Sequence, residues 1–228
     1  MLEEVWGNLP GNSVLGMLFP AGQTPLDNDT WGVTIEYIDD GYVSDEDAAE
    51  IDYDDMLKEL QADTQTESKA RVEAGYEAIS LVGWASPPYY DPSTNKLHWA
   101  QEYAFADVEE NTLNYNIRVL GRKGLLHMNF IAGMSQLDTI KDNVDTVLAL
   151  AEFDQGSTYA EFDPSMDKVA AYGLGALVAG KVLAKTGLIA AAIIFLKKFG
   201  VFIVLGLGAL VGRLFKKKSA DDNDTAVT

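Results

Sequence analysis

A long apolar stretch near the C-terminus most constrains how this chain can fold. Residues 169–215 contain no acidic residue, and only four lysines and one arginine interrupt them. A soluble domain would have to bury this stretch completely, and the remainder of the chain is too small to cover it. About 20 mostly apolar residues suffice for a helix to cross the hydrocarbon core of a bilayer. The stretch therefore predicts a protein that is anchored in a membrane.

Three arrangements of this stretch in a membrane are open. In the first, one helix spans residues 199–215, with basic residues at both interfaces. In the second, the span begins near Gly187 and places two lysines deep in the bilayer, which is costly unless they face protein or water. In the third, residues 169–196 also enter the membrane and form a hairpin with the rest. We expect the first, whose anchoring residues are Lys197, Lys198, Arg213, Lys216, Lys217 and Lys218.

The segment that precedes the span is expected to lie on the membrane surface. Asp163 followed by Pro164 is typical of a helix start, because aspartate caps the first turn and proline suits its first position. Lys181 and Lys185 lie four residues apart and share one face, while the other faces are apolar. This pattern predicts an interfacial amphipathic helix that leads into the transmembrane helix.

Pairs of small residues four positions apart occur in the same region. Ala176 pairs with Gly180 in this way, and Gly208 pairs with Gly212. Such spacing lets helix backbones approach closely in lipid, so we expect these residues to pack helices together and the chain to form a homo-oligomer. The alternative is that they reflect only the general frequency of glycine in membrane helices.

Charge divides the chain into an acidic part and a basic part. Residues 1–167 carry 8 Lys+Arg and 32 Asp+Glu, a net charge of −24, whereas residues 168–228 carry 9 and 3, a net charge of +6. The acidic part disfavours nucleic acid, and the basic part favours a lipid bilayer with anionic head groups. The chain has no cysteine, which excludes disulfides, thiolate metal sites and cysteine nucleophiles.

The soluble part is expected to be an antiparallel α+β domain with flanking helices. Alternating, aromatic and β-branched residues predict strands over residues 31–38, 79–84, 97–105, 113–120 and 125–132. The second strand is expected to end at Pro87-Pro88. Helices are predicted over residues 53–75, from Ser135 to residue 152 with Asp138 in the cap, and briefly after Ser44 with Asp47 in the cap.

These observations divide the chain into five parts. They are an N-terminal loop region (1–30), the soluble acidic domain (31–162), the juxtamembrane amphipathic helix (163–186), the transmembrane region (187–218) and a polar tail (219–228).

No catalytic residue, metal ligand or cofactor site is predicted. Residues 175–181 imitate a phosphate-binding loop, but Val182 stands where that loop needs serine or threonine. His98 alternates with Trp99 on a predicted strand, so we expect the imidazole to face away from the core; a metal there would need a carboxylate such as Glu102. The acidic run 39–63 is expected to be a solvated face.

Two groups of residues are candidates for a partner surface. Polar side chains share one face of a predicted strand and continue into its turn, and their arginines are scarce cations in a domain with a net charge of −24; these are Asn114, Asn116, Arg118 and Arg122. Tyr89 and Tyr90 stand among turn residues in an aromatic-rich segment, and exposed aromatic side chains are enriched at protein interfaces.

Three separated segments occur in an order that resembles a known family. They are GWASPPYYDPSTNKLHWAQEY, LNYNIRVLGRKGLL and YAEFDPSMDKVAAYGLGALVAGKVLAKTGL. Together they resemble an uncharacterised family of bacterial membrane-anchored proteins that is known only as a domain of unknown function. The resemblance implies a periplasmic domain and a single span in the bacterial inner membrane, and the α+β pattern also resembles the PsbP-like fold.

Members of that family usually begin with an export signal, whereas this sequence begins Met1-Leu2-Glu3-Glu4. We therefore expect that the native gene starts further upstream. The function expected is a membrane-anchored, non-enzymatic interaction module of the bacterial cell envelope whose partner is an unidentified envelope protein. An oligomeric membrane channel or transport accessory is the alternative, and an enzyme of unrecognised type is the third reading.

Overall fold

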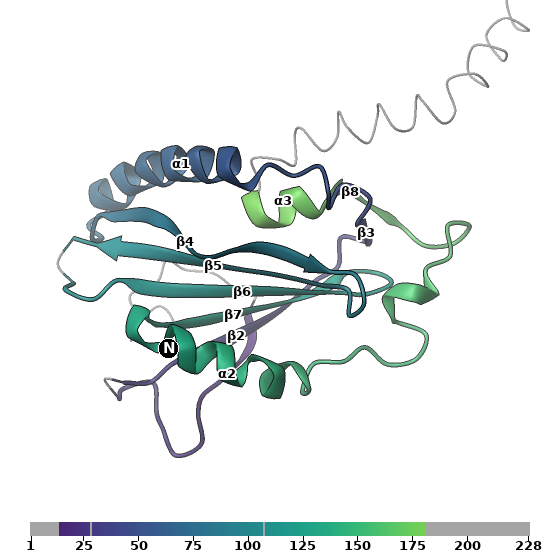
Figure 1. The fold of residues 1–228 in the computed structure, drawn as a ribbon, viewed down its shortest axis with the longest axis horizontal. Coiled ribbons are helices and arrows are strands. Elements are labelled where there is room, and N and C mark those ends of the chain that lie inside the picture. The colour runs from purple at the N-terminus through teal and green to yellow at the C-terminus, as the bar shows by residue number, and fades with distance from the viewer. Residues whose placement is uncertain (1–13, 28, 107, 181–228) are drawn as a thin grey trace, which may run out of the picture.

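The strands of this chain build one large antiparallel sheet that separates two hydrophobic cores. The computed structural model describes residues 14–180, apart from residues 28 and 107. Helix α2 (Leu137–Leu148) covers one face of the sheet, while helix α1 (Tyr53–Glu73) and a small second sheet cover the other (Figure 1). The expected α+β class, with a mostly antiparallel sheet and few helices, is confirmed.

Six strands form the main sheet in the order β1-β2-β7-β6-β5-β4, and each neighbouring pair is antiparallel. Their bounds are β1 Val14–Leu18, β2 Gly32–Ile38, β4 Ile79–Asp91, β5 Lys96–Phe105, β6 Thr112–Leu120 and β7 Leu125–Gly133. The second sheet pairs β3 (Tyr42–Ser44) with β8 (Val169–Gly173) in parallel. The remaining elements are helix α3 (Leu174–Ala179) and two 3-10 turns, η1 (Met134–Gln136) and η2 (Tyr159–Glu161).

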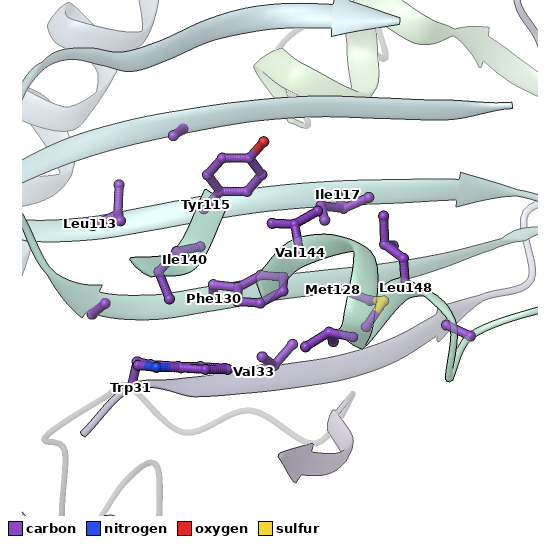
Figure 2. Close-up of a cluster of buried hydrophobic side chains, with 14 of the residues drawn as sticks. Trp31, Val33, Leu113, Tyr115, Ile117, Met128, Phe130, Ile140, Val144 and Leu148 are labelled. Carbon is purple, nitrogen blue, oxygen red and sulfur yellow. The ribbon is translucent and has the colours of Figure 1, made fainter. Parts of the chain in front are cut away.

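Alternation along each strand sends apolar side chains to both faces of the sheet, because successive residues point to opposite sides. The face under α2 is filled by a cluster around Phe130, whose ring meets Trp31 and Tyr115 with centroids 5.8 and 6.1 Å apart (Figure 2). Ile140 and Val144 of α2 are buried against this cluster. The opposite face carries Leu97, Trp99 and Leu125, which are buried beneath α1, β8 and α3.

Several predicted elements form as expected. The strands from residues 31–38, 97–105, 113–120 and 125–132 and the helix from residue 53 are all present within a few residues of their predicted ends. Asp52 caps α1 by accepting hydrogen bonds from the amides of Asp54 and Asp55.

Other predictions are wrong in their local detail. Residues 14–18 form the edge strand β1 and are not loop, because they pair with β2. Pro87 and Pro88 do not end β4; they lie at an irregularity in its pairing with β5, and the strand continues to Asp91. Ser135 does not cap α2 with its side chain; its amide instead donates to the carboxylate of Glu110 at 2.9 Å.

The helix predicted to begin at Asp163-Pro164 is also wrong for residues 163–173. Asp163 organises only a tight turn, and Val169–Gly173 pair with β3 as strand β8. Gly41 makes this possible: its φ of 102° belongs to the left-handed region, and a Cβ there would lie 2.6 Å from the carbonyl oxygen of Lys168. The apolar side chains that suggested an interfacial helix, among them Ala170, Leu174 and Leu177, are buried in the second core.

The short helix expected after Ser44 is replaced by turns. Asp47 nevertheless caps a helix, although not its own, because its carboxylate accepts hydrogen bonds from the amides of Leu174 and Gly175 at the start of α3. Among the described residues, no helix is long and apolar enough to cross a membrane. The span predicted over residues 199–215, its basic anchors from Lys197 to Lys218, and the pair Gly208 and Gly212 lie outside the described residues.

Candidate functional site

A groove of about 410 Å³ lies between helix α2 and the ends of strands β4 and β5. Strand β4 and the turn after it supply Tyr89, Asp91 and other polar side chains, and β5 supplies Lys96 and His98. Volumes of this size suit small-molecule ligands or a short stretch of a longer one. The lining residues are Ser86, Tyr89, Asp91, Thr94, Lys96, His98, Tyr115, Lys141, Val144, Asp145 and Leu148.

Tyr89 and His98 form the aromatic part of this groove. They are directly opposite one another in the β4–β5 ladder, so both side chains point to the α2 side of the sheet. Their rings stack with centroids 4.8 Å apart and planes only 4° apart. The tyrosine remains 48% exposed, whereas the histidine is 5% exposed. The buried imidazole therefore covers one face of the Tyr89 ring, while the Tyr89 residue stays 48% exposed to solvent.

His98 is electrically neutral at physiological pH. Burial lowers the pKa of its imidazole to about 4, since the desolvated ring disfavours the charged form. The Nδ1 atom of His98 is buried and has no hydrogen-bond partner among the described residues. The ring of Tyr115 meets the imidazole edge-on at 6.4 Å, and burial raises the pKa of the Tyr115 phenol. The groove thus has an uncharged aromatic floor.

Charged side chains of both signs surround this floor. Lys96 and Lys141 contribute two ammonium groups, and Asp91 and Asp145 contribute two carboxylates. The carboxylate of Asp91 already accepts hydrogen bonds from the Ser93 amide and hydroxyl and from the Thr94 hydroxyl, which lower its pKa to about 2. The groove consequently offers both hydrogen-bond donors and hydrogen-bond acceptors, with equal numbers of positive and negative side chains.

The polar groups of the groove are placed around its aromatic ring. The described residues contain no group of three or more His, Cys, Asp and Glu side chains placed to hold a metal ion. His98 is stacked on Tyr89 and meets Tyr115 edge-on, and among the described residues its buried Nδ1 has no serine or threonine hydroxyl to activate. What the groove presents is an oriented aromatic ring within a polar rim.

The residues predicted for a partner surface lie on different faces of the domain. Tyr89 is in the groove. Tyr90 points to the opposite face of the sheet, where its hydroxyl donates to Asp45 at 2.9 Å. Asn114, Asn116 and Arg118 do share one face, as predicted, but that face lies on the α1 and β8 side of the sheet.

These three side chains, which α1 and β8 cover, contact one another and neighbouring residues of the sheet. The Asn116 side chain donates to the carbonyl of Asn114 at 3.2 Å, and its Oδ1 lies 3.0 Å from Nε2 of His127. Arg118 stands 5.2 Å above the ring of Trp99, and its Nε and Nη1 atoms are buried without a hydrogen-bond partner among the described residues. Burial lowers the pKa of Arg118 to about 9. Asn114, Asn116 and Arg118 therefore belong to the interior between the main sheet and the layer formed by α1 and β8.

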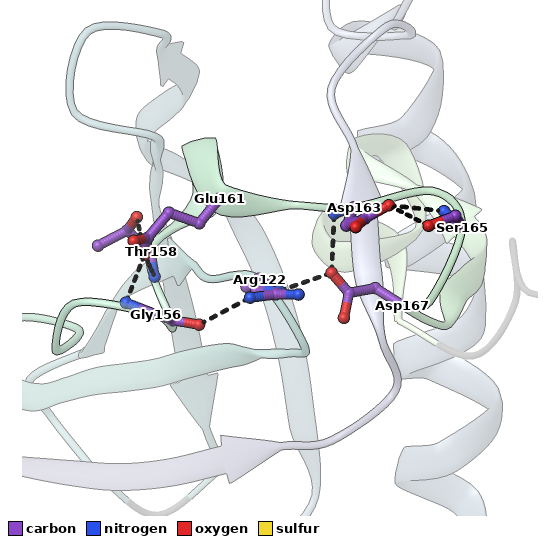
Figure 3. Close-up of polar contacts among 7 residues, drawn as sticks. All are labelled: Arg122, Gly156, Thr158, Glu161, Asp163, Ser165 and Asp167. Atoms are coloured by element: carbon purple, nitrogen blue, oxygen red, sulfur yellow. Dashed lines mark hydrogen bonds and ion pairs between the residues drawn. The ribbon is translucent and has the colours of Figure 1, made fainter.

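Arg122 lies apart from these residues, in the turn between β6 and β7. Its Nε donates to Asp167 at 2.6 Å and its Nη1 donates to the carbonyl of Gly156 at 3.3 Å (Figure 3). A second shallow hollow of about 360 Å³ is lined by Arg122 with Lys123 and Lys168. Of the predicted helix-packing pair, Ala176 lies within α3, and Gly180, with a φ of 69°, is the residue that caps its C-terminal end.

The sequence identifies Tyr89 but not the groove. His98 was expected to face away from the core, and that is wrong: the side toward α2 is itself a hydrophobic core. Both faces of β5 are buried, so alternation along the strand does not distinguish inside from outside. The signal that could have placed His98 correctly is the predicted helix from residue 135. Its apolar side needs an apolar face of the sheet to cover, so both faces of the sheet must be buried.

The comparison with curated proteins and with solved structures finds no match to this chain. A family model does match, over residues 1–208, and it is described as "Protein of unknown function (DUF2167)". The chain belongs to that family, which confirms the resemblance to an uncharacterised domain family.

Proposed function

We propose that this member of the family is a membrane-anchored, non-enzymatic binding module of the bacterial cell envelope, and that its ligand occupies the groove beside α2. The observation that carries this proposal is the half-exposed ring of Tyr89, which is held flat against the buried imidazole of His98. A rigid aromatic ring loses little conformational entropy when a ligand covers it, and such rings dominate the energetics of many binding sites.

The membrane attachment rests on the apolar composition of residues 199–215 and on the lysines and arginine that flank it. If this segment spans the bilayer, the full-length protein stays in the membrane fraction after washing with carbonate and with high salt. Release into the supernatant under either condition would contradict the anchor.

We further propose that the acidic domain is periplasmic. Basic residues do not decide the orientation, because four lie shortly before the span and four lie at or after its end. The family resemblance favours export. Alkaline phosphatase fused before Trp31 of the native product should be active, and a fluorescent protein fused after Thr228 should fluoresce. The reverse pair of results would place the domain in the cytoplasm.

The groove itself is tested by photo-crosslinking in native membranes. A benzophenone amino acid placed at Tyr89 should give a covalent adduct, since the ligand would lie on that ring. The matched control is Tyr37, a tyrosine of strand β2 that is 41% exposed and does not line the groove. Adducts of equal yield at the two positions, or none at Tyr89, would contradict the assignment of the groove as a binding site.

A further inference from the structure

We infer that the groove binds an uncharged oligosaccharide, with one hexopyranose ring packed on the exposed face of Tyr89. The inference rests on the proposed function, because it assumes that the groove is a binding site, and it names the chemistry of the ligand. Three properties of the groove lead to it: an oriented aromatic plane, a rim of balanced polar groups, and a strand edge that is closed to peptides.

The aromatic plane suits the apolar face of a sugar. The π-face of tyrosine carries partial negative charge, and the axial C–H bonds of a pyranose present partial positive charge over a flat area of similar size. Tyr89 offers that face in a fixed orientation, because its other face is stacked at 4.8 Å on His98. The neutral imidazole adds no charge that would favour an ion over the ring.

The rim suits a ligand with many hydroxyl groups. A sugar hydroxyl both donates and accepts, so it uses ammonium, carboxylate and hydroxyl partners alike. Lys96 and Lys141 line the groove together with Asp145 and Ser86. A polyanionic ligand would face a domain whose residues 1–167 carry a net charge of −24, and a strongly cationic one would meet the two lysines.

The edge of the sheet argues against a peptide in extended form. Strand β4 is an edge strand, and peptides commonly bind by adding to such an edge. Here Gln61 donates to the carbonyls of Leu81 and Val82, while Ser68 accepts from the amide of Ile79. Further along, two successive prolines, Pro87 and Pro88, have no N–H to offer. The backbone ladder that a peptide would need is therefore interrupted at residues 79–82 and at Pro87-Pro88.

The test uses the full-length protein in lipid nanodiscs without sugar-based detergent. Saturation-transfer NMR is recorded with the tetramer of β-1,4-linked N-acetylglucosamine and with cellotetraose, each at up to about 10 mM, a range that detects millimolar affinity. We expect saturation of ring C–H protons of at least one tetramer. The tetramer of galacturonic acid, which carries a carboxylate on every ring, should bind more weakly than the uncharged probe.

Three variants connect the signal to the groove. Tyr89→Ala should weaken binding by about tenfold, which is the loss expected for one aromatic stacking contact. Tyr89→Phe should bind like the parent, since it keeps the ring, and Tyr37→Ala is the matched control that should change nothing. Absence of saturation transfer from both uncharged tetramers, or binding that Tyr89→Ala leaves unchanged, would overturn the inference.

The crosslinked adduct at position 89 separates failure of this inference from failure of the proposed function. Mass spectrometry that identifies hexose units on the adduct supports an oligosaccharide ligand. An adduct that contains only a peptide would overturn the inference of an oligosaccharide ligand but would leave the groove as the binding site. The absence of any adduct specific to position 89 would overturn both.

Discussion

The guanidinium of Arg122 donates to the carboxylate of Asp167 at 2.6 Å and so ties the β6–β7 turn to the segment that precedes β8. The same carboxylate oxygen accepts the amide of Asp163 at 2.8 Å. This one hydrogen bond, donated by Arg122 and accepted by Asp167, lowers the pKa of Asp167 and raises the pKa of Arg122. One side chain thereby positions two loops that are far apart in the sequence (Figure 3).

Removing this ion pair should expose the segment around Asp167. Arg122→Gln should accelerate tryptic cleavage after Lys168, because the loop loses its tie to the hairpin. The control is Lys58→Gln, which removes the pair between Lys58 and Asp55 on the exposed surface of α1 and should leave the cleavage rate unchanged. Because the folded-state pKa of Asp167 is lowered, its contribution to stability is present above its unfolded pKa near 4 and is lost as pH falls below that. Equal cleavage rates in all three proteins would contradict the role of the pair.

The packing of α2 on the sheet predicts that two leucines near its end contribute very differently to the free energy of unfolding. Leu148 is 5% exposed and lies in the core, whereas Leu150 is 72% exposed. Leu148→Ala should lower the free energy of unfolding by about 2–5 kcal/mol through lost burial and a cavity. Leu150→Ala should change it by less than about 0.5 kcal/mol. Thermal unfolding of the two variants in one detergent provides the measurement, and similar losses would mean that α2 is rotated from the position described.

His98 predicts a loss of stability on mild acidification. Its folded-state pKa of about 4 is below the ordinary value of 6.5, so the unfolded chain binds the proton first as pH falls. The free energy of unfolding is therefore unaffected above pH 6.5 and declines as pH falls from 6.5 toward 4, by about 3 kcal/mol in all. His98→Gln should have a shallower decline over this interval. An NMR titration that gives the imidazole of the parent protein a pKa near 6.5 would refute the prediction.

The cap that Asp47 places on α3 joins two segments that are 127 residues apart in the sequence. Asp47→Ala should destabilise the protein by about 0.5–2 kcal/mol, because the amides of Leu174 and Gly175 lose their acceptor. Glu46→Ala, at the exposed neighbouring position, is the control and should change stability by less than about 0.5 kcal/mol. Hydrogen exchange at the two amides gives a direct measurement, and it should rise only in the Asp47 variant.

How far the sequence predicts the fold depends on how local the deciding interactions are. The helix from residue 53 has its own cap in Asp52, and β6 and β7 are joined by a short turn, so both are predicted correctly. Strand β8 is different. Its sequence is compatible with helix, and what makes it a strand is pairing with β3, more than 120 residues away.

The groove could not be predicted from the sequence, for a related reason. It lies where residues 141–148 of α2 meet the end of β4, and this meeting depends on the packing of the whole sheet. Tyr89 could be identified as a candidate because it is an aromatic residue among turn-forming ones. That it stacks on His98 depends on the β4–β5 register, which the irregularities around the two prolines shift.

The parallel pairing of β3 and β8 also has a mechanical consequence. A force that draws residue 180 away from the domain along the direction of β8 loads this pair in shear, so that the pairings of Tyr42 with Val169 and of Ser44 with Gly173 resist it together. The cap from Asp47 and the hydrogen bond from the Tyr172 hydroxyl to Asp40, at 2.7 Å, add to the same joint. Tension applied at the C-terminal end of the domain is therefore transmitted directly into the β3–β8 sheet.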